Sequence, residues 1–123
     1  MKEVLFNTPD QPCFIGAWYL PQIFICDRII AAYDSGSLQK GEGRLGSHKG
    51  DPKGQVKKTM KDSIDASLLK RPDLIDDFTA NLLAVLEQYK QKFFYANEVE
   101  TFVVDDLNIQ KYPKQTGGYH AWH

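Results

Sequence analysis

The chain has 123 residues, of which 42% are hydrophobic and 25% charged. This is an ordinary globular composition for one domain, which we place over residues 1–123. The formal net charge of −1 excludes a global attraction to nucleic acid or to anionic membranes. The sequence contains no apolar run of the roughly 18 residues that span a membrane, and no secretory signal at its start. We therefore expect a cytoplasmic protein.

Cys13 and Cys26 are the two cysteines of the chain. Their spacing is not that of a CxxC pair, so we expect buried, reduced thiols, as in other cytoplasmic proteins. A disulfide or a shared metal ion is the alternative.

The first third of the chain predicts a strand, a helix and a loop. Residues 13–20 are aromatic and β-prone, and Pro21 ends them. Hydrophobic residues recur near helical spacing over residues 23–33, and Asp34-Ser-Gly36 supplies a stop, which predicts an amphipathic helix of about three turns. Residues 36–54 are rich in glycine and predict an irregular hairpin or a mobile loop.

A strand and a long helix are predicted next. Residues 55–65 alternate imperfectly, and we interpret them as a strand. One face would carry Val56, Lys58, Met60 and Asp62, and the other would carry Lys57, Thr59, Lys61 and Ser63. Pro72 suits a first helical turn, and acidic residues follow it while lysines precede residue 93, so a helix is expected over 72–93. Its apolar stripe would be Leu74, Phe78, Leu82, Val85 and Tyr89.

The last part of the chain predicts strands. Residues 99–104 and 107–112 have strand character on either side of an Asp105-Asp106 turn. Helices followed by strands indicate the α+β class. Within the single domain, residues 1–95 would form a mixed support region and residues 97–123 the first core strands.

Histidines are the main chemical feature of the C-terminus. Side chains two apart on a strand share a face and those three apart do not, so a regular strand directs His120 and His123 to opposite sides. On residue pattern alone, metal ligation by both is disfavoured. Two other motifs are weak: Ser63 has no local histidine or Gly-x-Ser-x-Gly turn, and Gly41-Glu-Gly43-Arg-Leu-Gly46 has no helix pattern after it.

The terminal motif resembles a known family. Asn108-Ile-Gln-Lys-Tyr112, followed by Pro113, Gly117-Gly118, Tyr119 and Trp122-His123, is similar to the first metal-binding strand of the iron(II)/2-oxoglutarate-dependent dioxygenases, in their prolyl-4-hydroxylase-like group. The upstream order of elements resembles that group more loosely. The resemblance implies helices packed on the strands of a partial double-stranded β-helix, a jelly-roll or cupin-like core.

The same resemblance implies roles for particular residues. His123 matches the first iron ligand, and Tyr112 matches a tyrosine that contacts the 2-oxoglutarate carboxylate. Tyr119 and Trp122 would line the mouth of the barrel. For Tyr112 and Tyr119 a place in the strand core is an equal alternative, and His120 has no role that carries over.

The resemblance also implies what this chain does not supply. The acidic partner two places after the first histidine, the second histidine and the basic anchor of 2-oxoglutarate have no positions here. We therefore expect the N-terminal part of a hydroxylase, inactive alone, whose cofactors Fe(II) and 2-oxoglutarate belong to the complete domain. Its substrate would be a peptide, a protein or a small molecule.

Two other functions were weighed. A non-catalytic binding or assembly domain would complete its sheet by strand addition, for example as a homo-oligomer through an open edge. Nucleic-acid binding would use the basic segment 40–62, which carries seven Lys or Arg residues against three acidic ones, a balance of +4. We interpret that segment as a substrate lid or a solvated surface, and expect neither nucleic-acid nor membrane partners.

Overall fold

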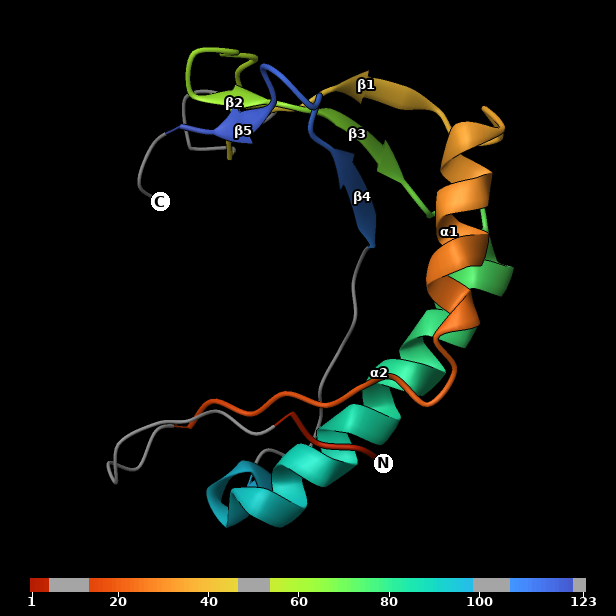
Figure 1. Ribbon diagram of the computed structural model, residues 1–123, viewed down its shortest axis with the longest axis vertical. Coiled ribbons are helices and arrows are strands. Elements are labelled where there is room, and N and C mark those ends of the chain that lie inside the picture. The colour runs from red at the N-terminus through yellow and green to blue at the C-terminus, as the bar shows by residue number, and fades with distance from the viewer. Residues whose placement is uncertain (5–13, 47–53, 99–106, 121–123) are drawn as a thin grey trace. The chain divides into compact units, whose positions relative to one another are not determined.

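The computed structural model describes residues 1–4, 14–46, 54–98 and 107–120. Its described residues form α-helices and small antiparallel sheets, which confirms the α+β class (Figure 1). The chain divides into two compact units, Met1–Arg28 with Arg71–Asp105 and Ile29–Lys70 with Asp106–His123. The predicted turn at Asp105-Asp106 and the predicted strand over 99–104 lie outside the described residues.

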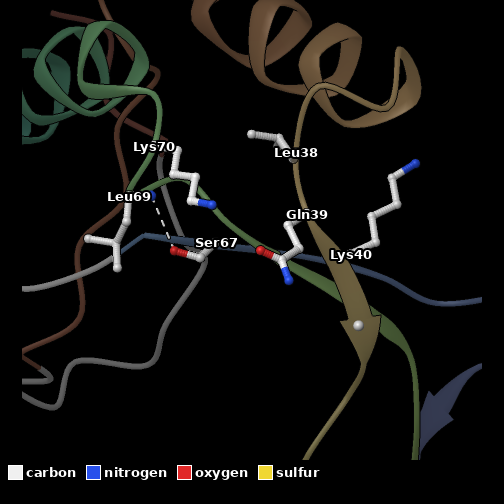
Figure 2. Close-up of a pocket in the computed structure, with 7 residues that line it drawn as sticks. Leu38, Gln39, Lys40, Ser67, Leu69 and Lys70 are labelled. Atoms are coloured by element: carbon white, nitrogen blue, oxygen red, sulfur yellow. Dashed lines mark hydrogen bonds between the residues drawn. The ribbon is translucent and has the colours of Figure 1, made fainter.

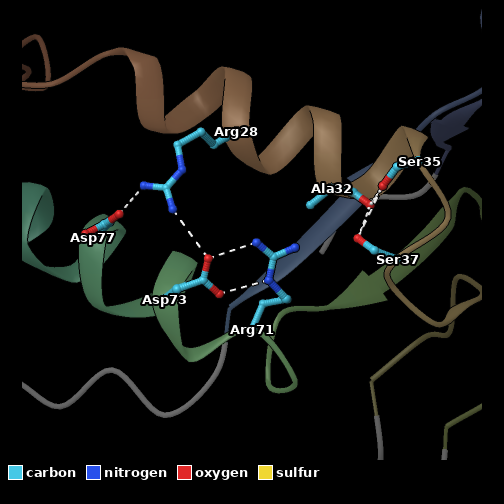
Figure 3. A network of polar contacts seen from close by, with 7 residues as sticks. All are labelled: Arg28, Ala32, Ser35, Ser37, Arg71, Asp73 and Asp77. Carbon is cyan, nitrogen blue, oxygen red and sulfur yellow. Dashed lines mark hydrogen bonds and ion pairs between the residues drawn. The ribbon is translucent and has the colours of Figure 1, made fainter.

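Helix α1 spans Phe24–Asp34, close to the prediction. The chain turns away from the helix at Gly36, which adopts a positive φ of 78°. Glycine adopts this conformation at little cost because it has no side chain. Ser37 Oγ donates a hydrogen bond of 2.9 Å to the carbonyl oxygen of Ala32, and Ser35 Oγ donates one of 3.1 Å to the same oxygen (Figure 3). These hydroxyls satisfy a carbonyl that the helix itself leaves unpaired.

Helix α2 spans Pro72–Lys92 and confirms the predicted helix within one residue. Pro72 occupies its first turn, where no backbone N–H is needed, and lysines occupy its last turn. Leu74 of the predicted stripe is buried, as expected, but Leu82 is exposed, and Asn81, which was not in the stripe, is buried. Asn81 Oδ1 accepts the N–H of Gln22 at 2.9 Å, so a polar side chain is satisfied within this buried face.

A short 3-10 helix, η1 (Phe94–Glu98), follows α2. The predicted strand over residues 13–20 is wrong for the part that is described. There Trp18 alone pairs, in a single antiparallel bridge with Glu3. Hydrogen bonds from Val4 N to Ala17 O and from Tyr19 N to Lys2 O flank this bridge.

The second unit contains two small sheets. Strands β1 (Lys40–Glu42), β3 (Ile64–Ser67) and β4 (Asn108–Lys111) form a three-stranded antiparallel sheet in the order β1-β3-β4 (Figure 1). Strands β2 (Lys61–Asp62) and β5 (Gly118–Tyr119) form a two-stranded antiparallel sheet. Residues 61–67 therefore contribute one strand to each sheet.

Two strand predictions need correction. The predicted strand over 55–65 is wrong for residues 55–60, because the N–H groups of Met60 and Lys61 both bond to the carbonyl oxygen of Lys57 and form a turn. The pleat therefore begins only at Lys61. In the glycine-rich segment, β1 pairs with β3 rather than forming a hairpin by itself. A bond of 2.8 Å from Leu45 N to Gln55 O is the hairpin-like contact described there.

The core of the second unit lies on one face of its three-stranded sheet. Ala66 and Leu68 are buried there with Tyr33 and Leu38. The Tyr33 hydroxyl donates a hydrogen bond of 3.2 Å to Ile64 O, and Lys40 Nζ lies 4.2 Å from the Tyr33 ring centroid. The end of α1 is thus fixed to the sheet by packing, by a hydrogen bond and by a cation–π contact.

Candidate functional site

The other face of the sheet in this unit is polar. Residues paired directly across antiparallel strands share a face, and the register pairs Asp65 with both Gly41 and Gln110. Lys61 pairs with Tyr119 in the second sheet. Alternation from these pairs defines the polar face, which consists of Gly41, Gly43, Lys61, Ser63, Asp65, Ser67, Asn108, Gln110, Tyr112 and Tyr119.

A charged cluster lies buried at one end of the polar face. Lys61 is 5% exposed and Ser63 is 3% exposed. The Lys61 ammonium donates a hydrogen bond of 2.7 Å to Asp65 Oδ2, and the Ser63 hydroxyl donates one of 2.7 Å to Asp65 Oδ1. Both carboxylate oxygens are therefore satisfied, and the pair carries no net charge. A lysine side chain is rarely buried to this extent unless it is paired with an acidic group.

Backbone from the glycine-rich segment covers this cluster. The carbonyl oxygen of Arg44 lies 3.4 Å from Lys61 Nζ, and Gly43 N donates a bond of 2.8 Å to Ser63 O. A Cβ atom on Gly43 would lie 2.1 Å from Ser63 Oγ, too close for two non-bonded atoms. Glycine at this position thus permits the backbone to pack directly against the cluster.

Tyr112 lies on the polar face, next to Gln110. Its hydroxyl donates a hydrogen bond of 3.0 Å to Gln110 Oε1, and the residue is 39% exposed. This exposure leaves the phenol accessible to a ligand and is not that of a core tyrosine. The amide NH₂ of Gln110 offers hydrogen-bond donors of the kind that recognise a carboxylate, whereas the Tyr112 phenol would have to leave Gln110 Oε1 before it could donate to a ligand.

Tyr119 and His120 lie after a tight turn. Gly117 N donates a bond of 2.7 Å to Pro113 O, which closes the turn. Tyr119 is half-buried opposite Lys61. His120 is exposed, and its backbone N–H donates a hydrogen bond of 2.6 Å to Met60 O. Because neighbouring strand residues face opposite sides, His120 is not on the polar face.

The two remaining predicted site residues, Trp122 and His123, lie outside the described residues, as do His48 and Cys13. Within the residues that the structure does describe, no group of three or more His, Cys, Asp or Glu side chains is placed to hold a metal ion. Cys26 is a free, partly buried thiol. The described part of the site is thus a polar surface with candidate carboxylate donors.

The first unit carries an exposed ion-pair network on α1 and α2 (Figure 3). Arg71 donates two hydrogen bonds of 2.8 Å to the two carboxylate oxygens of Asp73. This contact lowers the pKa of Asp73 to about 2. Arg28 pairs with Asp77 and, at 3.4 Å, with Asp73. Every carboxylate here is used by an arginine, so we assign the network to stability.

Sequence reasoning brought Tyr112 and Tyr119 into the site but missed the buried cluster. It considered Ser63 only as a nucleophile and left Lys61 and Asp65 without a role. The pattern Lys61-x-Ser63-x-Asp65 places polar side chains at every second position of a strand. That alternation, read together with the glycines at 41 and 43, was the available indication of a polar face.

Comparison with protein-family models, with curated proteins and with solved structures finds no match to the chain. In the part of the chain that the structure describes, neither helix has the length and hydrophobicity needed to cross a membrane.

Proposed function

We propose that the chain is the N-terminal part of an iron(II)/2-oxoglutarate-dependent dioxygenase of the prolyl-4-hydroxylase-like group. The observation that carries this proposal is the polar face. Tyr112 and Tyr119, both from the terminal motif, share that face with the buried Lys61–Asp65 pair. A wall of polar side chains opposite an apolar core face is what a barrel interior that binds charged ligands requires.

The proposal includes the architecture of the complete domain. The two small sheets share residues 61–67, and in this proposal they are the first strands of a double-stranded β-helix. The polar face would be its interior and the face packed on Tyr33 its exterior support. Further strands would pair with the open edges of these sheets.

His123 is the proposed first iron ligand. It lies outside the described residues, and its role rests on the resemblance and on alternation. A strand that continues beyond Tyr119 directs every second residue, and therefore residue 123, to the face that Tyr119 occupies. By the resemblance, Trp122 would line the mouth of the barrel together with Tyr119.

The cosubstrate would be held in part by Tyr112. The Gln110 amide NH₂ would donate to a carboxylate, and the exposed Tyr112 hydroxyl would donate to it in place of Gln110 Oε1, its acceptor in this structure. Ferrous iron, when bound, supplies O₂ activation, by which 2-oxoglutarate is oxidised to succinate and CO₂ while a substrate C–H bond becomes C–OH. The residues of this chain bind and orient the carboxylate and help to exclude water.

Succinate formation tests the proposal. The chain extended by the residues encoded after His123 should form succinate from 2-oxoglutarate when Fe(II) is added, measured by proton NMR, whereas residues 1–123 alone should form none. In the extended chain, Tyr112→Phe should raise the KM for 2-oxoglutarate by about fivefold, the loss expected for one hydrogen bond. Tyr95→Phe, at an exposed tyrosine of the other unit, is the control. An extended chain that neither binds iron nor forms succinate contradicts the proposal.

A second candidate is a non-catalytic domain that assembles by strand addition. The observation that favours it is that β1 and β4 end the three-stranded sheet, with all three residues of β1 exposed. Edge strands of this kind pair with strands of other chains. Sedimentation velocity of residues 1–123 should then show a concentration-dependent oligomer, and a monomer at all concentrations contradicts it.

A further inference from the structure

A cavity of about 340 Å³ lies beside β1, lined by Leu38, Gln39, Lys40, Gly41, Ser67, Leu69 and Lys70 (Figure 2). Its volume falls within the usual range for small-ligand sites. Gly41 and Ser67 belong to the polar face, so the cavity continues that face at the end away from Lys61. Its lining includes neither the residues of the buried cluster nor Tyr112, and neither the motif nor its resemblance assigns it a role.

Two polar groups are directed toward the same part of this cavity. The Lys70 ammonium and the Gln39 amide oxygen point toward Ser67, whereas Lys40 points away (Figure 2). Ser67 Oγ accepts a hydrogen bond of 3.1 Å from Leu69 N, as the dashed line shows. The lining has one inward-pointing cation and no carboxylate. Its polar end therefore attracts an anionic group.

The remaining walls are aliphatic. Leu38, which is buried, and Leu69, which is 62% exposed, both line the cavity. A carboxylate on a short alkyl chain matches this arrangement, because the leucines pack on the methylene groups while Lys70 and Gln39 bind the oxygens.

The edge strand beside the cavity favours a peptide as the source of that carboxylate. The outer backbone groups of β1 have no strand next to them in the described sheet. A Cβ placed on Gly41 meets no atom within 4 Å, so the polar face is open beside this residue of β1. An extended peptide beside β1 would form backbone hydrogen bonds and direct alternate side chains toward the cavity.

We propose that this cavity binds the side-chain carboxylate of an acidic residue in an extended peptide docked on β1. This proposal names an acidic peptide as the substrate class of the proposed hydroxylase. It rests on the proposed function only where it calls the peptide a substrate. Binding itself requires neither iron nor turnover. Peptide binding without succinate formation, or the reverse, therefore separates failure of one proposal from failure of the other.

Fluorescence anisotropy of residues 1–123 tests the inference. The probe is a fluorescein-labelled Gly-Ser-Glu-Ser-Gly peptide at low salt, compared with the same peptide carrying Gln in place of Glu. Lys70→Gln should weaken binding of the Glu peptide by about tenfold, as expected for loss of one charge-assisted hydrogen bond. Lys57→Gln removes the same charge at an exposed site outside the cavity and should leave the affinity unchanged.

Each outcome decides the matter. Weaker binding after Lys70→Gln together with a preference for Glu over Gln supports the site. Equal affinity of the unsubstituted chain for the Glu and Gln peptides overturns the proposal. An equal loss of affinity in Lys70→Gln and Lys57→Gln also overturns it, because it would indicate general electrostatic attraction. Free glutarate that displaces the peptide with comparable affinity would also overturn it, because the ligand would then be a small acid.

Discussion

Glycine at position 43 is required by the side chain that it packs against. Gly43→Ala would bring a methyl group to 2.1 Å from Ser63 Oγ, and we expect a loss of about 1–3 kcal/mol in the free energy of unfolding from the resulting displacement. Gly41→Ala, two residues earlier in β1, meets no atom within 4 Å and is the matched control. Urea unfolding measures both, and equal stabilities for the two variants would contradict the close packing.

The Lys61–Asp65 pair predicts a second residue-scale effect. Asp65→Asn leaves the buried Lys61 ammonium without its carboxylate and should cost about 2–3 kcal/mol. The double variant Lys61→Met/Asp65→Leu should lose less free energy of unfolding than the single variants Lys61→Met and Asp65→Leu lose together. The reason is that no unpaired charge remains buried in the double variant. Urea unfolding of the single and double variants gives the coupling, and strict additivity would show that the pair does not interact.

An exposed pair between β1 and the turn before β2 provides the comparison for that cycle. Lys58 Nζ lies 2.8 Å from Glu42 Oε1, with both side chains more than half exposed. Lys58→Met should leave the urea midpoint unchanged, since solvent screens such pairs. We therefore expect that burial, rather than the presence of an ion pair, decides which of these two lysines contributes to the free energy of unfolding.

At the scale of elements, the start of α2 predicts a pH effect. The hydrogen bonds from Arg71 hold the pKa of Asp73 at about 2, below the ordinary value of 3.8. Because the folded-state pKa is lowered, the stabilisation is complete above about pH 4 and is lost as the pH falls toward about 2. NMR titration of the Asp73 carboxyl should give the low midpoint, and Arg71→Gln should return it toward 3.8. An unchanged midpoint would contradict the role of Arg71.

The two α-helices were predictable because their information is local. Pro72, the acidic residues after it and the final lysines mark the ends of α2 within a few residues of each end. The strand over 55–65 was only half predictable. Val56 and Met60 alternate as in a strand, yet the carbonyl of Lys57 accepts two N–H groups and closes a turn. The hydrogen bonds of this turn, and not the hydrophobic pattern, set the backbone conformation of the segment.

At the scale of the whole molecule, charge and exposed apolar surface predict association. The isoelectric point is about 6.3, so near that pH little net charge opposes contact between molecules. Several large apolar side chains are more than half exposed, among them Phe14, Ile15, Ile23 and Phe94. Light scattering at low salt should be strongest near pH 6.3 and fall as the pH is raised and the chain becomes negative. A scattering signal independent of pH would contradict this.

The sequence by itself determined the α+β class, both α-helices, and the strand character of the segment that contains β4. It also contained the terminal motif that motivates the proposed function. Only the tertiary structure decided that β1 and β4 flank β3 and that β5 joins β2. The physical reason is that helix formation depends on residues within a turn or two, whereas strand pairing joins segments tens of residues apart. Lys61, Ser63 and Asp65 become a buried cluster only after those distant segments meet.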